Sequence, residues 1–268
     1  MTGLGTRQTS AAQNQRPKEA SIAAKPIRVM VADDSVVAWV VARRALKTAP
    51  NVQVVAAVAD GQSAINRLPT ARPDVLILDI EMPIKSGLEA LPELLALDPG
   101  LKVVIVSSLT KRNADICMTA LRAGASDVLA KPASNPDAVA KFSAELCTKV
   151  LNLGGIPRSK RNSAGTDAAL TAHPRPTARA TTHNWGEIAA IAIGSSTGGP
   201  QALTATLSKW SAQGATLPVF ITQHMPPMFT HSLAEHIARI SGAIAREAVH
   251  GEVVEPGRIY LAPGDMHI

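Results

Sequence analysis

Ser196 is the residue whose type and setting most clearly indicate chemistry, because an apolar run over residues 191–193 passes there through small residues into a helical segment. Gly194 and Gly198 place it in a Gly-x-Ser-x-Gly context, and we expect them to remove Cβ atoms that would collide in a sharp strand-to-helix turn. The N–H groups of the following helix would then stabilise an oxyanion. The pattern predicts a nucleophilic serine, although such a turn alone is also typical of phosphate-binding or purely structural glycine loops.

His224 follows the next predicted strand of the same region, and the carboxyl ends of parallel strands share one edge of a sheet. We therefore expect His224 to lie near Ser196. Its imidazole can take the proton of the serine and return it to a leaving group. Without Ser196, His224 would be interpreted as a structural histidine. Surface or linker roles are expected for five other histidines that have no comparable partner, His183, His231, His236, His250 and His267.

Three carboxylates follow predicted strands earlier in the chain. Asp33 and Asp34 come directly after the first strand, and Asp79 ends the third. Each of them alone would be interpreted as a turn former. Three like charges that converge at one sheet edge require a cation, and a hard divalent ion such as Mg²⁺ would leave a position for a phosphoryl oxygen.

Two further strand ends contribute a hydroxyl and an ammonium group to the same edge. Ser107 follows the fourth strand, and Lys131 with Pro132 follows the fifth. Together, Ser107 and Lys131 could bind the oxygens of a phosphoryl group attached to Asp79, and Pro132 would fix the loop that positions the lysine.

Alternating strands and helices must position these groups, which indicates the α/β class. The first set has predicted strands at 27–32, 52–57, 75–78, 103–106 and 127–129 and predicted helices at 36–48, 63–68, 88–97, 114–123 and 138–151. The second set has predicted strands at 188–193, 218–223 and near 258–261 and predicted helices at 201–210 and 230–240. The pattern predicts two doubly wound parallel-sheet domains joined by a flexible linker.

Composition sets the predicted domain boundaries in this chain of 268 residues. Residues 1–26 are polar without a sustained period and are predicted to form a disordered tail. Residues 151–186 are rich in Pro, Gly, Ser, Thr and Ala and basic side chains, which is typical of an interdomain linker. The two domains are therefore expected at 27–150 and 187–268.

The net charge of +6 lies mainly in the tail and the linker, whereas residues 187–268 are net acidic. The basic residues are interleaved with almost no aromatic side chains, so no nucleic-acid groove is expected. No stretch has the ~18 apolar residues of a membrane span, and no signal peptide is seen. We expect no membrane insertion and a cytoplasmic protein in which Cys117 and Cys147 are reduced thiols.

Residues 27–150 closely resemble a response-regulator receiver domain, which has a flavodoxin-like fold, and the run Asp79-Ile80-Glu81-Met82-Pro83 and residues 87–89 carry the match. The resemblance implies phosphoryl transfer from a chemotaxis histidine kinase to Asp79. It implies a Mg²⁺ site formed by Asp33, Asp34, Asp79 and the backbone carbonyl of Glu81, and a rearrangement centred on Ser107. The switch position three residues before Lys131 is often aromatic in receivers and is Val128 here.

Residues 188–268 look like the start of the catalytic domain of the chemotaxis protein-glutamate methylesterases, the CheB family. Residues 194–199, 222–226 and 262–265 carry this resemblance. It implies that Ser196 is the nucleophile, His224 the general base, and the Thr197 N–H an oxyanion donor. The implied substrates are methylated glutamates of methyl-accepting chemoreceptors, with deamidation of receptor glutamines as a second activity.

The family's third catalytic residue is an aspartate in a motif far downstream, which orients the histidine. The sequence stops before that motif, and Asp265 belongs to a different matched segment. We therefore expect an incomplete methylesterase domain that lacks its later strands and helices. The alternative is a catalytically inactive, phosphorylation-responsive binding module of chemotaxis. A DNA-binding regulator is disfavoured because no helix-turn-helix pattern follows the linker.

Overall fold

The computed structural model describes residues 25–156, 188–210 and 216–268. Most of the predicted tail and most of the predicted linker lie outside these ranges. Among the described residues, five strands form a parallel sheet in the order β2-β1-β3-β4-β5. The strands are β1 (Ile27–Ala32), β2 (Val52–Val58), β3 (Val75–Asp79), β4 (Lys102–Ser107) and β5 (Asp127–Ala130).

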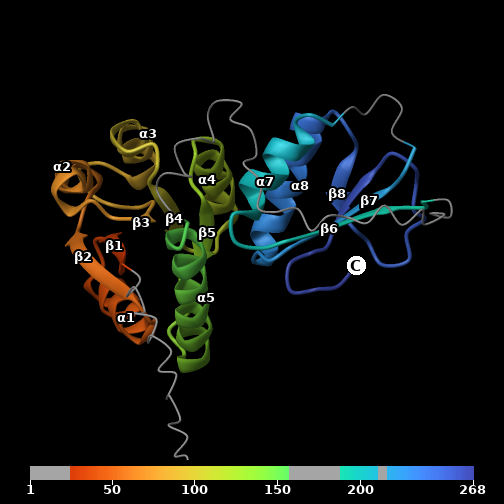
Figure 1. The fold of residues 1–268 in the computed structure, drawn as a ribbon. Coiled ribbons are helices and arrows are strands. Elements are labelled where there is room, and N and C mark those ends of the chain that lie inside the picture. The colour runs from red at the N-terminus through yellow and green to blue at the C-terminus, as the bar shows by residue number, and fades with distance from the viewer. Residues whose placement is uncertain (1–24, 157–187, 211–215) are drawn as a thin grey trace, which may run out of the picture.

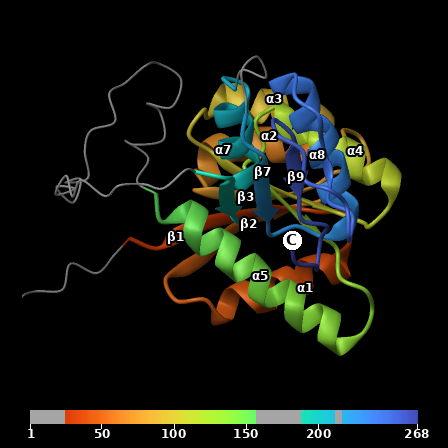
Figure 2. The same ribbon diagram turned by 90° about the vertical axis from the view of Figure 1, so that its right-hand side faces the viewer.

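Helices cover both faces of this sheet, and together they form the flavodoxin-like fold that was predicted (Figure 1). In the second view, α1 and α5 lie on one side of the sheet, and α2, α3 and α4 on the other (Figure 2). The helices are α1 (Val36–Thr48), α2 (Gly61–Ala71), α3 (Gly87–Leu97), α4 (Lys111–Arg122) and α5 (Pro136–Gly154). Crossovers of this kind bring the carboxyl ends of all strands to one edge.

A second parallel sheet follows, in which the described strands have the order β6-β7-β9-β8. The elements are β6 (Ile191–Ser195), α7 (Gly199–Leu207), β7 (Val219–Gln223), α8 (Pro227–Ser241), β8 (Ala245–Glu247) and β9 (Ile259–Leu261). Helices α7 and α8 lie between this sheet and α4 of the first domain (Figure 1). The prediction of two parallel-sheet α/β domains is confirmed.

Several boundaries differ from the predicted ones. Helix α5 continues to Gly154, into the segment predicted as linker, because Val150 and Leu153 are buried against the first sheet. Strand β6 begins at Ile191 and not at 188. Strand β8 was not predicted, because three residues without a strong apolar pattern give too short a signal.

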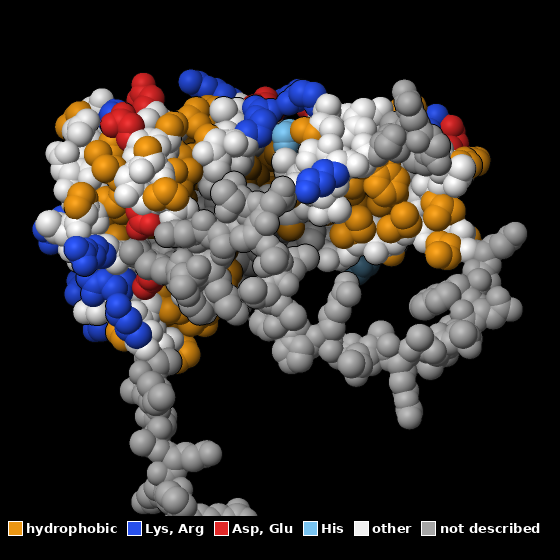
Figure 3. Space-filling model, turned by 45° about the horizontal axis from the view of Figure 1, so that its top comes forward, with side chains coloured by type: hydrophobic (Ala, Val, Ile, Leu, Met, Phe, Trp, Pro, Cys, Tyr) orange, Lys and Arg blue, Asp and Glu red, His pale blue; other side chains and the backbone are white. Residues whose placement is uncertain are grey.

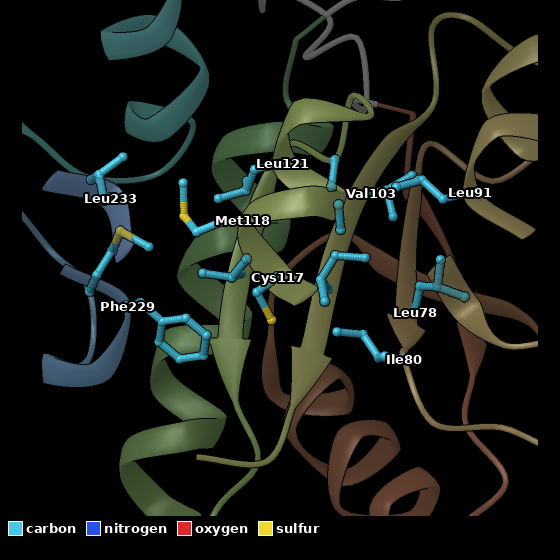
Figure 4. Packing of buried hydrophobic residues seen from close by; sticks show 14 of the residues in the cluster. Leu78, Ile80, Leu91, Val103, Cys117, Met118, Leu121, Phe229 and Leu233 are labelled. Atoms are coloured by element: carbon cyan, nitrogen blue, oxygen red, sulfur yellow. The ribbon is translucent and has the colours of Figure 1, made fainter. Parts of the chain in front are cut away.

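The hydrophobic core does not stop at the domain boundary. One cluster of buried side chains on the α2-α3-α4 face of the first sheet continues into α7, α8 and the second sheet. In Figure 4, Met118 of α4 points towards Phe229 and Leu233 of α8. All three side chains are at most 3% exposed. Separating the domains would therefore expose apolar surface to water.

The space-filling view shows how charged and hydrophobic side chains are distributed on one face (Figure 3). Lys and Arg side chains gather at the top, where the domains meet, and on the outer flank of the first domain, and hydrophobic side chains are exposed on both domains. No described helix has the length and apolar character needed to cross a membrane. Both cysteines are free thiols, and burial raises the pKa of Cys117 to about 12.

Candidate functional site

The predicted carboxylate cluster forms at the carboxyl edge of the first sheet. Asp33, Asp34 and Asp79 each offer an oxygen, and these atoms lie within 4.8 Å of one another. Asp79 is buried, Asp33 half-buried and Asp34 exposed, so the cluster opens to solvent on one side. Burial raises the pKa of Asp79 above its ordinary value, against the opposing hydrogen bond and charge of Lys131.

Lys131 joins two members of the cluster. Its Nζ lies 2.6 Å from Oδ2 of Asp79 and 3.4 Å from Oδ2 of Asp33. Burial works against its charge, but the hydrogen bond and charge of Asp79, together with Asp33, raise the pKa of Lys131 above its ordinary value. The ammonium group thus occupies the position beside Asp79 from which it can bind an oxygen of an attached group.

The side chain of Ser107 indicates that a ligand binds at this edge. The side chain is buried next to the thiol of Cys117, a weak hydrogen-bonding group, and its Oγ makes no hydrogen bond to a nitrogen or oxygen atom of the described residues. An unsatisfied buried hydroxyl costs roughly 1–3 kcal/mol, so native structures rarely retain one without a reason. The backbone N–H of Glu81 donates to Oδ1 of Asp79 at 3.4 Å, which places Glu81 beside the cluster as well. An oxygen-rich set of this kind fits Mg²⁺.

Glycine is required where the chain leaves this edge. A Cβ at Gly87 would lie 1.9 Å from the backbone oxygen of Asp79. The Gly87 N–H donates to the carbonyl of Ile80 at 3.0 Å, so α3 begins directly against the end of β3. Ser86 and Glu89 form a capping box that fixes the first turn of α3.

The second predicted site lies at the carboxyl edge of the second sheet. Ser196 follows β6 directly and is exposed. Gly198 adopts a left-handed φ of 73°, which disfavours other residues, and it is the N-cap of α7. A Cβ at Gly199 would lie 1.9 Å from Oε1 of Gln223. The expected Cβ collision was wrong for both Gly194 and Gly198, because a Cβ at either position would meet nothing within 4 Å, and it is the left-handed φ of Gly198 that favours glycine there.

A backbone hydrogen bond holds His224 next to the turn that carries Ser196. Its N–H donates to the carbonyl of Ser195 at 3.1 Å, in continuation of the β6-β7 pairing. The side chains of Ser196 and His224 are both exposed, and within the described ranges no hydrogen bond joins them. The two strand ends are therefore neighbours, as expected, whereas no hydrogen bond joins the serine hydroxyl to the imidazole among the described residues.

Gln223 is a residue that the sequence analysis missed. Its side chain is 5% exposed and bonds to residues on both sides of the site, Ser195 and Ser196 on one side and His224 on the other. A signal existed: Val219, Ile221 and Gln223 share the buried face of β7, and a glutamine in that alternation requires polar partners.

Receiver residues contact the turn that follows Ser196. The Asp127 carboxylate accepts a hydrogen bond from the Gly198 N–H at 3.1 Å. The Oγ1 of Thr197 accepts one from Nδ2 of Asn152 at 3.3 Å. The side chain of Gln201 donates to the carbonyls of Gly124 and Ala125, which precede β5.

A cavity of about 220 Å³ lies between the two domains. Its lining includes Lys131 and Lys141 from the first domain and His224 and Asp265 from the second. Lys141 and Asp265 also approach each other at 3.6 Å across the cavity. The ammonium group of Lys131 therefore contacts the carboxylate cluster. The same side chain lines the cavity that His224 also lines.

The fold and the two sites together define a class: a response regulator whose receiver domain is joined to an α/β output domain with a serine and a histidine at one sheet edge. Comparison with known proteins agrees. Residues 29–143 match the model of the response regulator receiver domain, and residues 191–268 match that of the CheB methylesterase. The chain belongs to the family of CheB-type protein-glutamate methylesterases.

Individual relatives are similar over most of the chain. The protein-glutamate methylesterase/protein-glutamine glutaminase 1 of Paramagnetospirillum magneticum is 43% identical over 92% of this chain and 70% of its own length. The corresponding Azospirillum brasilense protein is 44% identical over 91% of this chain and 66% of its own. The chain thus spans about two thirds of these relatives. The solved response regulator domain of Thermotoga maritima CheB is 35% identical, with a TM-score of 0.45, over 50% of this chain and 99% of its own.

Proposed function

We propose that this chain is a phosphorylation-regulated protein-glutamate methylesterase that removes methyl groups from glutamate methyl esters of chemoreceptors. The observation that carries the proposal is the joining of the β6 and β7 strand ends, which places Ser196 and His224 on one sheet edge. The names of the relatives support the same substrate class and add protein-glutamine glutaminase activity. Deamidation of receptor glutamines is therefore part of the proposal.

The proposed chemistry is acyl transfer in two steps. Ser196 Oγ attacks the ester carbonyl while His224 takes its proton, and His224 then gives that proton to the departing methanol. Water, deprotonated by His224, releases the glutamate carboxylate and restores the serine. The Thr197 N–H is free to stabilise the oxyanion formed in this reaction, because no described residue accepts a hydrogen bond from it.

The proposed input is phosphorylation of Asp79 by a chemotaxis histidine kinase. Mg²⁺, when bound by Asp33, Asp34, Asp79 and the Glu81 carbonyl, would neutralise charge on the transferred group. Lys131 and the Ser107 hydroxyl would bind phosphoryl oxygens, as their positions beside Asp79 favour.

The interdomain contacts favour regulation by domain docking. In the docked arrangement the receiver bonds to Thr197, Gly198 and Gln201, all of which follow the proposed nucleophile closely. Phosphorylation would bias this interface towards release, with Lys131 as the link between Asp79 and the cavity at His224. The boundaries proposed for the functional units are residues 27–150 for the receiver and 187–268 for the esterase part.

One observation favours a second candidate, a binding module without catalysis. The His224 ring forms no hydrogen bond or ion pair with any carboxylate in the described ranges, so nothing there orients it. Such a module would respond to phosphorylation by releasing its second domain to bind receptors or the kinase.

The deciding experiment measures methanol release from methylated chemoreceptors by the full chain, with and without a small-molecule phosphodonor. Release that rises with phosphodonor in the wild type, is lost in Ser196→Ala and no longer responds to phosphodonor in Asp79→Asn supports the proposed function. Absence of release from the wild type in both conditions overturns it in favour of the binding module.

A further inference from the structure

The structure assigns to Gln223 the role of a positioning residue that sets the spacing between the turn of Ser196 and the strand end of His224. This inference rests on the proposed function and deepens it. Gln223 is the last residue of β7, and its register partner on β6 is Ser195. It therefore stands directly before His224 and directly across from the residue that precedes Ser196.

The amide of Gln223 uses both of its ends. Its Oε1 accepts a hydrogen bond from the Ser195 hydroxyl at 2.6 Å. Its Nε2 donates to the carbonyl of Ser196 at 2.9 Å and to the carbonyl of His224 at 3.3 Å. One planar group of fixed size thus joins the backbone of the proposed nucleophile to the backbone of the proposed base.

Burial makes this bridge important. The side chain is 5% exposed, so water competes little with its bonds, and an unsatisfied buried amide would be costly. The Ser196 carbonyl oxygen also accepts a hydrogen bond from the Gly199 N–H at 2.7 Å, so the same oxygen also holds the first turn of α7. Displacing the amide would leave the Ser196 turn held by fewer bonds on the side of β7.

Gly199 is matched to this side chain. A Cβ at Gly199 would lie 1.9 Å from Oε1 and 2.8 Å from Cδ of Gln223, and both side-chain atoms would have to move. The absence of a side chain at Gly199 therefore makes the space in which the amide lies. Gln223 and Gly199 form a pair in which either change disturbs the same bridge.

The first test is Gln223→Glu in the full chain. The carboxylate has nearly the same size but no N–H to donate, so Ser196 O and His224 O lose their shared donor. Because small misplacements of reacting groups can cost ~100-fold in rate, we expect kcat to fall by about that factor, with KM nearly unchanged. The rate at which a fluorophosphonate probe labels Ser196 should fall in parallel.

Gln201→Glu is the matched control. Gln201 also donates from Nε2 to two backbone carbonyls, those of Gly124 and Ala125, but it joins the domains and not the two strand ends. It should leave the labelling rate of phosphodonor-treated protein near the wild-type value. Equal losses of kcat and labelling in the two variants would overturn the role of Gln223.

The second test combines Gln223→Glu with Gly199→Ala. Both changes act on one bridge, so the double variant should lose less activity than the product of the two single losses. Multiplicative losses would mean that the two residues act independently and would overturn the inference. Melting temperatures of all variants separate these effects from loss of folded protein.

A third readout does not depend on turnover. Amide exchange measured by NMR reports the bonds of the Gly199 and His224 N–H groups, which donate to Ser196 O and Ser195 O. Both amides should exchange faster in Gln223→Glu than in Gln201→Glu, and equal rates would overturn the positioning role. If the wild type neither releases methanol nor reacts with the probe, the proposed function fails while this readout still tests Gln223.

Discussion

The Asp127 carboxylate accepts a hydrogen bond from the backbone N–H of Gly198 at 3.1 Å, which connects β5 of the receiver to the turn that carries Ser196. The other carboxylate oxygen of Asp127 lies 3.0 Å from Nζ of Lys149, and both side chains are at most 2% exposed. Glu145 approaches the same ammonium group at 3.5 Å. The contact with the serine turn is thus part of a buried charge network within the receiver.

We predict that removing the charge of Asp127 weakens domain docking. Asp127→Asn alone would leave Lys149 buried with a weaker partner, which costs about 3–5 kcal/mol when a buried pair is broken, so the variant to make is Asp127→Asn with Lys149→Met. The asparagine oxygen can still accept from the Gly198 N–H, but without a negative charge, and a loss of about 1 kcal/mol shifts the docking equilibrium about five-fold. Methanol release without phosphodonor should rise, and stimulation by phosphodonor should shrink.

The matched control for this prediction is Lys149→Met alone, which keeps the carboxylate on Gly198. It should change stability without raising the unstimulated rate to the level of the double variant. An unstimulated rate in the double variant equal to that of the wild type would show that the Asp127 contact contributes nothing to docking.

We next predict that the apolar part of the interface contributes as much as the polar part. Met118 packs between α4 and α8 against Phe229 and Leu233 (Figure 4). Met118→Ala should cost about 2–5 kcal/mol, shared between receiver stability and docking. Limited proteolysis should cut between the domains faster, and the unstimulated esterase rate should rise.

Leu91 provides the comparison for Met118, because it is fully buried in the same cluster but belongs to α3. Leu91→Ala should lower the melting temperature by a similar amount without accelerating cleavage between the domains. Equal cleavage rates in the two alanine variants would argue against a docking role for Met118.

Much of this fold follows from the sequence, and the reasons are physical. Alternating strands and helices require a parallel sheet with its ligand edge at the strand ends, so the positions of Asp33, Asp79 and Lys131 were predictable. The contact between the domains was not predictable. Nothing in the sequence around Asp127 indicates that its carboxylate accepts a hydrogen bond from the N–H of a residue 71 positions away.

Local context explains the other misses. His236 was expected at the surface, yet it is 4% exposed because α8 is buried on two sides, by its own sheet and by α4. An amphipathic pattern shows one buried face well, whereas a second buried face depends on a neighbouring domain. The steric role of Gly194 and Gly198 was misjudged because the motif identifies the turn but does not say at which glycine a Cβ would meet another atom, and here that glycine is Gly199.

We predict that the carboxylate cluster binds Mg²⁺ with an affinity that depends on Asp34, its exposed member. Asp34→Asn removes one negative ligand without disturbing the buried pair of Asp79 and Lys131. A loss of ~1.4 kcal/mol would lower the affinity about ten-fold in calorimetric titrations. Asp137→Asn, at an exposed acid in the first turn of α5, should keep the wild-type affinity. Equal affinities in the two variants would exclude Asp34 from the site.

The last prediction concerns pH. His236 lies on α8 with its Nδ1 unpartnered among the described residues, and burial, followed by the charges of Arg122 on α4 and Arg239 on α8, lowers its pKa below the ordinary 6.5. The unfolded chain therefore binds a proton at a pH where the folded one does not. The stability that neutral His236 permits is complete above about pH 6.5 and is lost as the pH falls towards the lower folded-state pKa.

The measurement is the melting temperature of the wild type and of His236→Leu from pH 8 to pH 5. Below pH 6.5 the melting temperature should fall less steeply for His236→Leu than for the wild type, and above pH 6.5 the two curves should run parallel. Curves that stay parallel over the whole range would show that this histidine does not couple proton binding to folding.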